Sequence, residues 1–536
     1  MKAILSFFIC LAYTIGFSQG ASNSNFKTSP ILPNSNSDTQ TTSNIGSNGF
    51  KFELIDAGTN TKYSEIGSDI FKNKFILVSS KRIGGVAKID PNTGEAYKEL
   101  FRADISLTGE LTRPLLFSRI LNTNDSEDGL AFSPDQQTVY YTRSDKTNSL
   151  EFKLYKADLE ENTSGIWINH TLVSINKPNV SIETPFVNKN GDKLYFSANM
   201  PDAIGGYDLY VSTINSDGTL GTPENLGSTI NTSTDEKYPA LSIDEKHFFF
   251  SSKGHENLGG YDVFRCRMSK QGFSSAINLG NTINTPYDEI AYFLAGRNKG
   301  YVTSNREGGK GGYDIYTATN EDIAQGLSGD IADMETKIRL PNTLVILEDI
   351  DGEEIARTMS DEDGIYRFDV APYENYNLKT SKDGFKDASF PFFSNVGNTT
   401  DYEMDLELII TEPVIAELNN EMQIVLENIY FDINKYNVKE ESTVSLNKIV
   451  KVLNENKEMK LIINAHTDNK GRESYNLNLS NKRAASAVKY IVSKGISKDR
   501  LQSKGFGETK PLIDCKTNCS DEDLQANRRV EFVITD

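Results

Sequence analysis

An internal repeat restricts the fold of the N-terminal half more than any other feature of the sequence. The motif Gly-Gly-Tyr-Asp occurs three times, beginning at Gly205, Gly259 and Gly311, at intervals of about 50 residues. Each copy follows a short apolar run that ends in small polar residues, such as FFFSSK. Two weaker copies of this run begin at Phe75 and Val139. Repeats of this length, with about four short strands and turn residues between them, predict a β-propeller.

We predict that residues 50–321 form a five-bladed propeller. A strand signal at 50–58 precedes the first unit, and the last unit, which ends at Tyr316, lacks an evident fourth strand. Pairing these two segments would close the ring and leave no open sheet edge. A six-bladed propeller, with a degenerate blade within 90–130, is the alternative. We interpret the repeated motif as architecture, because its glycines allow a tight turn, its tyrosine packs and its aspartate accepts backbone hydrogen bonds.

A different pattern begins near residue 324. Polar and apolar residues alternate up to residue 408, between Asp-Gly turns at Asp351, Asp363 and Asp383. This pattern predicts a small antiparallel β-sandwich. The aspartates are interpreted as turn residues and not as calcium ligands, because their spacing fits no EF-hand loop. No metal site is expected anywhere in the chain.

The C-terminal residues 423–536 alternate between strand and helix signals, after an acidic linker at 409–422. This alternation predicts a compact α/β domain. The expected strands cover 424–431, 461–465, 500–505 and 530–534, and the expected helices cover 440–456 and 475–493. The whole chain is therefore predicted to be multidomain and mainly β.

A pair of opposite charges marks the candidate binding site in this domain. Asp468 follows an apolar strand, and Arg483 lies on the next helix. A carboxylate and a guanidinium suit a small zwitterion, since one accepts hydrogen bonds from an ammonium and the other grips a carboxylate. Leu479, one turn before Arg483, would form a wall of the site. The other predicted binding residues are Phe431, Asp432, Thr467, Asn476 and Arg529. The alternatives are an internal salt bridge between Asp468 and Arg483, and purely structural roles for Thr467, Asn476 and Arg529.

The composition narrows the range of partners. The net charge of −19 argues against nucleic acid or anionic lipid as the main partner. Residues 1–19 are predicted to be a signal peptide and residues 20–49 a disordered tether rich in Ser, Asn and Thr. No later stretch reaches the length of a membrane-spanning helix, so we expect no membrane span. In an exported protein, Cys515 and Cys519 are expected to form a disulfide, with two free thiols as the alternative.

Each of the three regions resembles a known family. The repeats, with Ser133-Pro134-Asp135 and the Gly-Gly-Tyr-Asp turns, resemble the WD40-like PD40 repeats of TolB-type propellers. Residues 324–408 resemble the carboxypeptidase regulatory-like module, notably around DEDGIYRF. Residues 423–536 resemble the OmpA-like peptidoglycan-binding domain. The motifs that carry this last resemblance are Phe431-Asp432, His466-Thr467-Asp468, Gly471, Tyr475-Asn476, Leu479-Ser480, Arg483-Ala484, Gly505-Phe506-Gly507-Glu508, Pro511 and Asn527-Arg528-Arg529-Val530-Glu531-Phe532.

The resemblance to the OmpA family implies a function. Asp468 and Arg483 match the residues that hold meso-diaminopimelate of peptidoglycan stem peptides, and the propeller is expected to dock an outer-membrane or periplasmic protein. The layout resembles OmpA-family proteins of Bacteroidetes-type bacteria, some of which anchor a secretion or gliding machine to the wall. We therefore expect a non-enzymatic anchor in the periplasm or at the outer membrane, with no catalytic residue and no cofactor. The alternative is a wall-tethered hydrolase that acts on glycan or peptide through the propeller.

Overall fold

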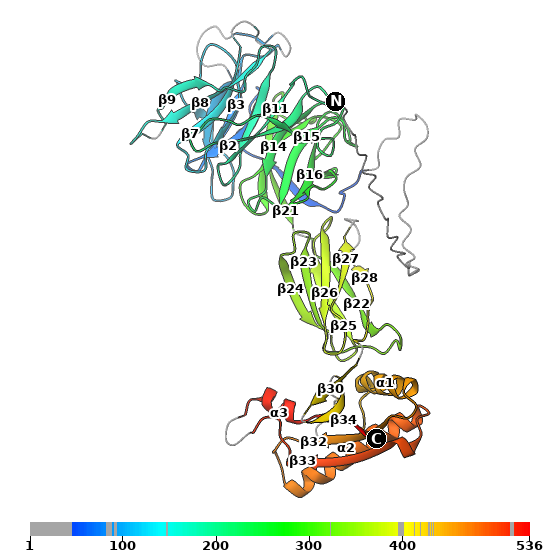
Figure 1. Ribbon diagram of the computed structural model, residues 1–536. Helices are drawn as coiled ribbons and strands as arrows, with labels where there is room; N and C mark the ends of the chain where they lie inside the picture. Colours follow the sequence, from blue (N-terminus) through cyan, green and yellow to red (C-terminus); the bar gives the residue numbers. More distant parts are fainter. Residues whose placement is uncertain are drawn as a thin grey trace, which may run out of the picture. The chain divides into compact units, whose positions relative to one another are not determined.

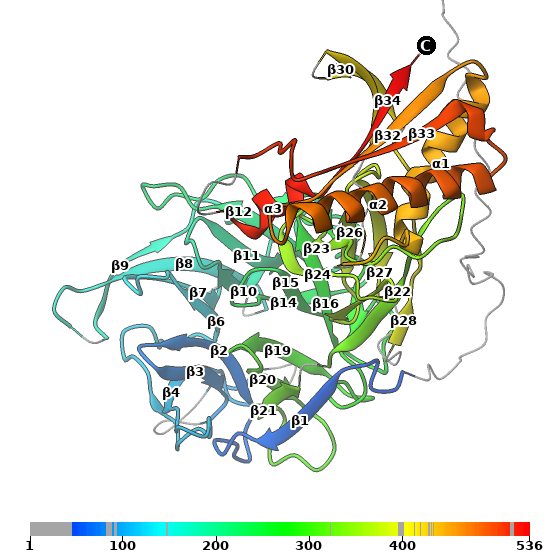
Figure 2. The same cartoon turned by 90° about the horizontal axis from the view of Figure 1, so that it is seen from below.

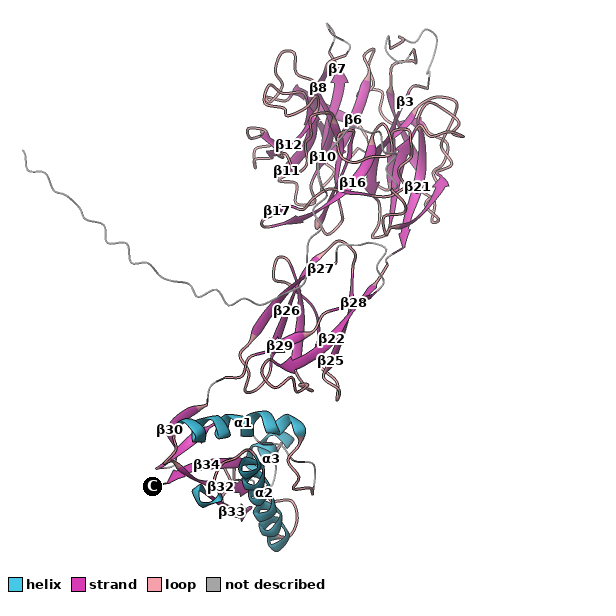
Figure 3. Ribbon diagram, turned by 90° about the vertical axis from the view of Figure 1, so that its right-hand side faces the viewer, coloured by secondary structure: helices cyan, strands magenta, loops and turns pink. Residues whose placement is uncertain are grey.

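The computed structural model describes residues 45–535 (Figure 1). The residues outside the description within this range are 82–87, 91–93, 146–147, 149, 164, 322, 395–400, 412, 419, 427–428, 430, 432–433 and 515–518. The predicted signal peptide and most of the predicted tether therefore lie outside the described residues. The described part is mainly β, and its α-helices all follow residue 439 (Figure 3).

Residues 51–321 form five consecutive antiparallel sheets, which we call the five-sheet domain. The first contains β2 (Glu65–Phe71), β3 (Lys74–Ser79), β4 (Glu99–Asp104) and β5 (Leu115–Leu116). The second contains β6 (Glu127–Phe132), β7 (Thr138–Ser144), β8 (Phe152–Leu159) and β9 (Trp167–Leu172). The third contains β10 (Ile182–Val187), β11 (Lys193–Ala198), β12 (Asp208–Thr213) and β13 (Glu224–Asn225). The fourth contains β14 (Glu236–Leu241), β15 (His247–Ser252), β16 (Asp262–Ser269), β17 (Gly272–Phe273) and β18 (Ile277–Asn278).

The fifth sheet joins the two ends of this domain. It contains β19 (Glu289–Leu294), β20 (Lys299–Ser304) and β21 (Asp314–Glu321), and β1 (Lys51–Asp56) pairs with β21 as the fourth strand. This confirms the predicted pairing of the first strand with the last unit. Within 90–130, the described strands belong to the first two sheets, and no further sheet for a sixth blade occurs among them.

The first strands of the five sheets follow one another in cyclic order. Contacts run from β2 to β6, β10, β14 and β19 and back to β2. A narrow cavity of about 40 Å³ between them is lined by residues of all five strands. Figure 2 shows these strands with their sheets arranged around this region.

Five asparagines link each sheet to the loop that leads into the next one. They are Asn60, Asn122, Asn176, Asn231 and Asn284, and we call them the bracing asparagines. The side-chain oxygen of each accepts a hydrogen bond from one backbone N–H on the third strand of a sheet, and its amide donates to the carbonyl of the same residue. Asn60 bonds to Ile315, so the fifth link connects the last sheet to the loop before the first.

The Gly-Gly-Tyr-Asp motifs have the predicted architectural role. Asp262 is fully buried and accepts a hydrogen bond from the backbone N–H of Leu258 and another, 2.7 Å long, from the side-chain amide of Asn278. Asp208 and Asp314 accept backbone hydrogen bonds in the same way. A Cβ atom on Gly311 would lie 1.8 Å from the carbonyl oxygen of Tyr63, so only glycine fits there.

Buried carboxyl groups make the stability of the five-sheet domain depend on pH. Burial raises the pKa of Asp69 to about 6 and the pKa values of Glu127 and Asp262 to about 7. Between about pH 4 and 7, the folded state therefore binds more protons than the unfolded state, and the free energy of unfolding falls as the pH rises. We expect a lower midpoint of thermal unfolding at pH 8 than at pH 5.5. The fluorescence of Trp167 reports the midpoint of thermal unfolding, because this buried residue is the single tryptophan of the chain.

The control for this prediction is Asp262→Asn, which removes one of the three groups. This variant should retain a smaller dependence of the midpoint on pH than the unchanged protein. A midpoint that rises from pH 5.5 to pH 8 would contradict the prediction.

The second region is a sandwich of two sheets. One contains β22 (Gln325–Asp333), β25 (Ile365–Val370), β28 (Asp401–Glu403) and β29 (Leu406–Leu408). The other contains β23 (Leu344–Asp349), β24 (Glu354–Met359), β26 (Asn375–Ser381) and β27 (Ala388–Phe393). Leu347, Tyr366 and Leu378 are buried in the core. The prediction of a purely antiparallel sandwich is wrong in one respect, because β28 and β29 pair in parallel with β22.

The third region is a five-stranded sheet covered by helices. Its strands are β30 (Val414–Leu418), β31 (Glu421–Val425), β32 (Lys460–His466), β33 (Leu501–Gly507) and β34 (Val530–Thr535), in the order β30-β31-β34-β32-β33. Its helices are α1 (Glu440–Glu455), α2 (Glu473–Ser493), the 3₁₀ turn η1 (Lys498–Arg500) and α3 (Asp521–Asn527). Within the described part of the chain, no helix combines the length and apolarity that crossing a membrane requires.

Two predictions for this region need correction. The acidic segment 409–422 is not only a linker, because β30 and the start of β31 form a hairpin that extends the sheet. The strand expected at 424–431 is described only up to Val425, as β31. The short helix α3 was not predicted, although its Ser520 side chain accepts a hydrogen bond from the backbone N–H of Asp523 in a capping box.

Candidate binding site

Asp468 lies in a loop at the carboxyl end of β32. The backbone N–H of the preceding Thr467 donates to the carbonyl of Gly507 over 2.9 Å, which ties the loop to the end of β33. One carboxylate oxygen of Asp468 accepts from the backbone N–H of Lys470. The side chain of Asp468 is 13% exposed, so the carboxylate is partly shielded but still accessible from solvent.

Asn476 holds this loop against helix α2. It is buried, and its side-chain amide lies 3.3 Å from the carbonyl oxygens of Asp468 and Lys470 and 2.6 Å from a carboxylate oxygen of Glu508. Gly471, with φ of +119°, completes the turn in a conformation that favours glycine. Asn476 therefore positions the loop that carries Asp468, and Glu508 is a partner in this arrangement that we did not predict.

Two glycines of β33 let helix α2 approach the sheet closely. The backbone N–H of Gly505 donates to the side chain of Asn481, and that of Gly507 donates to the hydroxyl of Ser480. A Cβ atom on Gly505 would lie 2.3 Å from the backbone nitrogen of Asn481. The close packing fixes the position of α2, and with it the predicted site residues Asn476, Leu479 and Arg483.

Gly505→Ala is expected to destabilise the C-terminal domain and weaken its site. The added methyl group must push α2 away from β33, and overpacking of this kind costs about 1–3 kcal/mol. Chemical unfolding followed by circular dichroism at 222 nm, where these helices dominate, would measure the loss. Gly495→Ala is the control without a steric clash, because no atom lies within 4 Å of a Cβ at this position. Its φ of +95° adds some backbone strain to this variant. Equal stability of Gly505→Ala and the unchanged protein would contradict the prediction.

Arg483 is buried on the face of α2 that points to the site. Its Nε donates to the carbonyl of Lys435 over 3.1 Å, and its guanidinium carbon lies 4.9 Å from the centre of the Phe431 ring. Burial lowers the pKa of Arg483, the charge of Asp468 opposes this shift and the charge of Arg528 adds to it. The structure therefore places Arg483 near Phe431 and within electrostatic range of Asp468.

Asp468 forms its ion pair with Arg528. The distance between Nη1 of Arg528 and Oδ2 of Asp468 is 2.6 Å. The alternative of a direct salt bridge between Asp468 and Arg483 is therefore not what the structure shows. Arg528 directly follows α3. Because we did not predict this helix, the sequence gave no reason to expect Arg528 as the partner of Asp468.

Arg529, which we predicted as a binding residue, has other partners than Asp468, and its role in binding stays a prediction. Its guanidinium forms an ion pair of 2.7 Å with Glu531 and donates to the carbonyl of Lys510. Burial would raise the pKa of Glu531, but a hydrogen bond from His466 and the charges of His466 and Arg529 lower it to about 2. Arg528 and Arg529 lie between α3 and β34, and they pair with different carboxylates, Arg528 with Asp468 and Arg529 with Glu531.

The remaining predicted residues are placed as follows. Leu479 is half-buried on α2, one turn before Arg483. Thr467 is buried, and its hydroxyl has no hydrogen-bond partner among the described residues. Asp432 and Cys515 lie outside the described residues, so the role of Asp432 and the disulfide between Cys515 and Cys519 stay predictions.

Comparison with known proteins finds family matches for the second and third regions. Residues 430–524 match the model of the OmpA family, and residues 326–407 match the carboxypeptidase regulatory-like domain. The C-terminal domain is an OmpA family domain. The chain is 40% identical over 116 residues to photosystem I P700 chlorophyll a apoprotein A2 of Gloeobacter violaceus, and 30% identical over 89 residues to the peptidoglycan-associated lipoprotein of Mesorhizobium japonicum.

These similarities involve only parts of the proteins. They cover 21% and 17% of this chain, and 13% and 53% of the two relatives. Among solved structures, the peptidoglycan-associated lipoprotein of Burkholderia pseudomallei is similar, with 24% identity, a TM-score of 0.19, and coverage of 20% of this chain and 91% of that one.

Proposed function

We propose that this protein is a non-enzymatic anchor of the cell envelope that binds peptidoglycan through its OmpA family domain. The observation that supports this most is that Asp468 and Arg483 lie near enough for their charges to interact, although the ion pair of Asp468 is with Arg528. A carboxylate close to a guanidinium is suited to a ligand with both an ammonium and a carboxylate. The free end of meso-diaminopimelate in peptidoglycan stem peptides carries both groups.

The two charged groups have separate roles in this proposal. The guanidinium carbon of Arg483 lies 4.9 Å from the centre of the Phe431 ring, and the guanidinium would form two parallel hydrogen bonds with the ligand carboxylate. Asp468 would accept hydrogen bonds from the ligand ammonium beside its bond to Arg528. Asn476 acts on Asp468 through the loop and would keep its carboxylate in place. Asp432, Leu479 and Thr467 would complete the walls of the site.

We also propose that the five-sheet domain is a closed five-bladed propeller that docks another protein of the envelope. The five bracing asparagines support closure, because the same pair of hydrogen bonds recurs at every junction, including the one between the last sheet and the first. A secretion or gliding machine in a Bacteroidetes-type bacterium is the partner that the layout of the three regions suggests. The protein would then act in the periplasm or at the outer membrane.

The first test is sedimentation of the full-length protein with purified peptidoglycan sacculi that contain meso-diaminopimelate. We expect the protein to pellet with these sacculi and to be released by free meso-diaminopimelate. Sacculi that contain lysine in place of diaminopimelate are the matched control, because lysine lacks the second carboxylate, and they should bind far less protein. Equal binding to both kinds of sacculi, or no binding to either, would contradict the proposal.

A further inference from the structure

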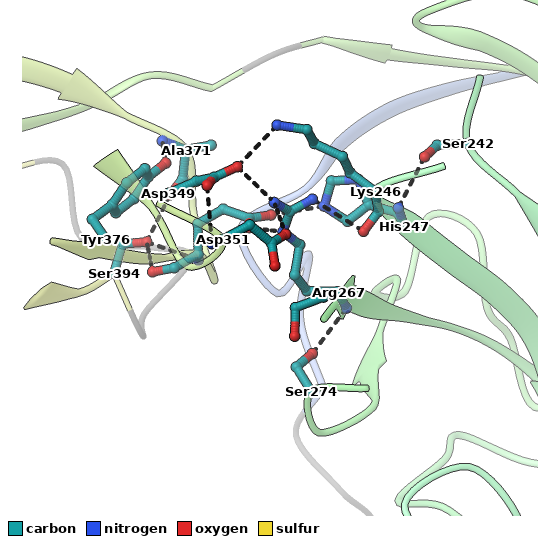
Figure 4. A network of polar contacts seen from close by, with 12 residues as sticks. Ser242, Lys246, His247, Arg267, Ser274, Asp349, Asp351, Ala371, Tyr376 and Ser394 are labelled. Atoms are coloured by element: carbon teal, nitrogen blue, oxygen red, sulfur yellow. Dashed lines mark hydrogen bonds and ion pairs between the residues drawn. The ribbon is translucent and has the colours of Figure 1, made fainter. Parts of the chain in front are cut away.

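The fourth sheet of the five-sheet domain presents a basic surface. Lys246 lies just before β15, His247 begins that strand, and Arg265 and Arg267 lie on β16. Figure 4 shows Lys246 and Arg267 directed at carboxylates of the sandwich. The carboxylates that face this surface are Asp349, Asp351, Glu353 and Glu374. Three permanent cations and a histidine thus meet four acidic side chains.

Arg267 lies at the centre of this contact. It is 5% exposed, and its guanidinium lies 3.1 Å from a carboxylate oxygen of Asp349 and 3.3 Å from one of Glu374. Its Nη2 donates to the carboxylate of Asp349 across the contact, and its Nη1 donates to the carbonyl of Lys246 within its own domain. A buried arginine without such partners would be strongly destabilising, because its charge would be removed from water without compensation. Arg267 is therefore adapted to a bound acidic surface and not to solvent.

The carboxylates are held in their charged form by the same contact. Lys246 lies 2.9 Å from Asp349, and Nε2 of His247 lies 2.7 Å from Glu374. Burial would raise the pKa of Glu374, but the hydrogen bond and charge of His247 and the charges of Arg265 and Arg267 lower it overall. Burial likewise opposes, but does not outweigh, the lowering of the pKa of Asp349 by Lys246. Both carboxylates are stabilised by residues of the other region.

An unusual backbone conformation adds an aromatic contact. Tyr373 has a φ of +62°, which is rare for a large side chain. Its backbone N–H donates to the carbonyl of the fully buried Ser394, which holds the turn in place. The Tyr373 ring stacks on Phe50 at a centroid distance of 5.8 Å, and its hydroxyl donates to Asn48. Strain of this kind persists where the surrounding structure requires it, and here it presents the ring to the five-sheet domain.

We infer that the acidic end of the sandwich is a docking surface specific for the fourth sheet, and that the two regions form one rigid unit. Without the sandwich, Arg267 and Arg265 would lose their acidic partners. Without the five-sheet domain, Asp349, Asp351 and Glu374 would repel one another. Each surface is thus stabilised by the other. The contact fixes the orientation of the five-sheet domain relative to the sandwich, so the sandwich does not act as a flexible spacer. This inference does not depend on the proposed function.

Hydrogen–deuterium exchange of the full-length protein, measured by mass spectrometry, tests this inference. The backbone N–H of Lys270 donates to Asp351 across the contact, and segments 265–270 and 349–353 should both be protected in the unchanged protein. We expect Asp349→Asn, a change in the sandwich alone, to increase exchange at 265–270 in the five-sheet domain by about tenfold or more. An effect in the other region is not expected from a residue that stabilises only its own loop.

A matched variant separates the contact from general destabilisation. Arg306→Ala removes an arginine that also pairs with a buried glutamate, Glu289, but within the fifth sheet and its neighbouring loop. It should leave exchange at 349–353 unchanged, whereas Arg267→Ala should increase it. Tyr373→Ala provides a second change on the sandwich side, and it should also increase exchange at 265–270. Rapid exchange at both segments in the unchanged protein, or no effect of Asp349→Asn and Tyr373→Ala at 265–270, would overturn the inference.

Discussion

Arg483→Ala and Asp468→Asn are each expected to lose most of the binding of this protein to peptidoglycan sacculi. Removing one member of a desolvated charged contact costs about 2–5 kcal/mol, which corresponds to at least about a 30-fold weaker affinity. Arg483 should show the larger effect, because it is buried and oriented by Phe431, whereas Asp468 remains partly exposed. The bound fraction after sedimentation, measured over a range of sacculus concentrations, gives both affinities.

Two variants of the same domain serve as controls for this prediction. Lys489→Ala changes an exposed cation on helix α2, and Asp499→Asn changes an exposed carboxylate in η1. Both should bind sacculi like the unchanged protein. Full binding by Arg483→Ala, with its fold retained by circular dichroism, would show that Arg483 has only a structural role.

Arg528→Ala separates two possible roles of Asp468. If Asp468 contacts the ligand ammonium, removal of Arg528 leaves that contact in place, and the variant should retain more binding than Asp468→Asn. If Asp468 only fixes Arg528 and helix α3, the two variants should lose equal amounts of binding. We expect the first result, because Arg528 is a cation and would itself repel the ligand ammonium. Equal losses would contradict the role that we propose for Asp468.

Asn60→Ala is expected to lower the free energy of unfolding of the five-sheet domain by about 1–3 kcal/mol. The change leaves the backbone N–H of Ile315 without its partner and removes one of the two donors to the carbonyl of Ile315, which still accepts from the N–H of Ala57. Asn284→Ala should have a similar effect, because it removes the equivalent pair of bonds to Val263. Urea unfolding followed by the fluorescence of Trp167 measures both losses.

The two asparagine variants should differ in where the structure opens. Asn60→Ala weakens the junction between the last sheet and the first, so amide exchange should increase in β1 and β21. Asn284→Ala should increase exchange between the fourth and fifth sheets instead. Asn281→Ala, at an exposed neighbouring position, is the control and should change neither stability nor exchange. Unchanged stability of Asn60→Ala would contradict the proposed closure of the ring.

The sequence predicted the fold best where a motif repeats, and it predicted the candidate site best where two opposite charges lie on either side of a turn. The period of the Gly-Gly-Tyr-Asp motif predicted five units, and the unpaired strand signal at 50–58 predicted the pairing of β1 with β21. The bracing asparagines were not predicted, because an asparagine before a turn is equally typical of an exposed loop. The burial of four glutamates was not predicted either. Each accepts a hydrogen bond from a threonine four residues earlier, and they are Glu65, Glu127, Glu236 and Glu289. Burial of polar residues depends on neighbours that are distant in the sequence.

In the candidate site, the residues on regular elements were easier to predict than those on short ones. Asp468 and Arg483 follow a clear strand and lie on a long helix, and the structure places them within electrostatic range of each other. The ion pair between Asp468 and Arg528 was not predicted, because Arg528 directly follows α3, a helix of seven residues that periodicity does not reveal. The contact between the sandwich and the fourth sheet was not predicted either, since charge complementarity between regions becomes visible only when both surfaces are known.

The pairing of β1 with β21 also determines the order in which the five-sheet domain can fold. Lys51 lies opposite Glu321, so the fifth sheet contains strands from both ends of the domain. As the chain emerges from the ribosome, the first four sheets can form by local hairpins, but the strand 51–56 must wait until residue 321 has been synthesised. Closing so long a loop carries an entropic cost before any contact compensates for it, so this last step should be the slow one. Until then, the unpaired backbone edges of β1 and β21 remain open to other chains.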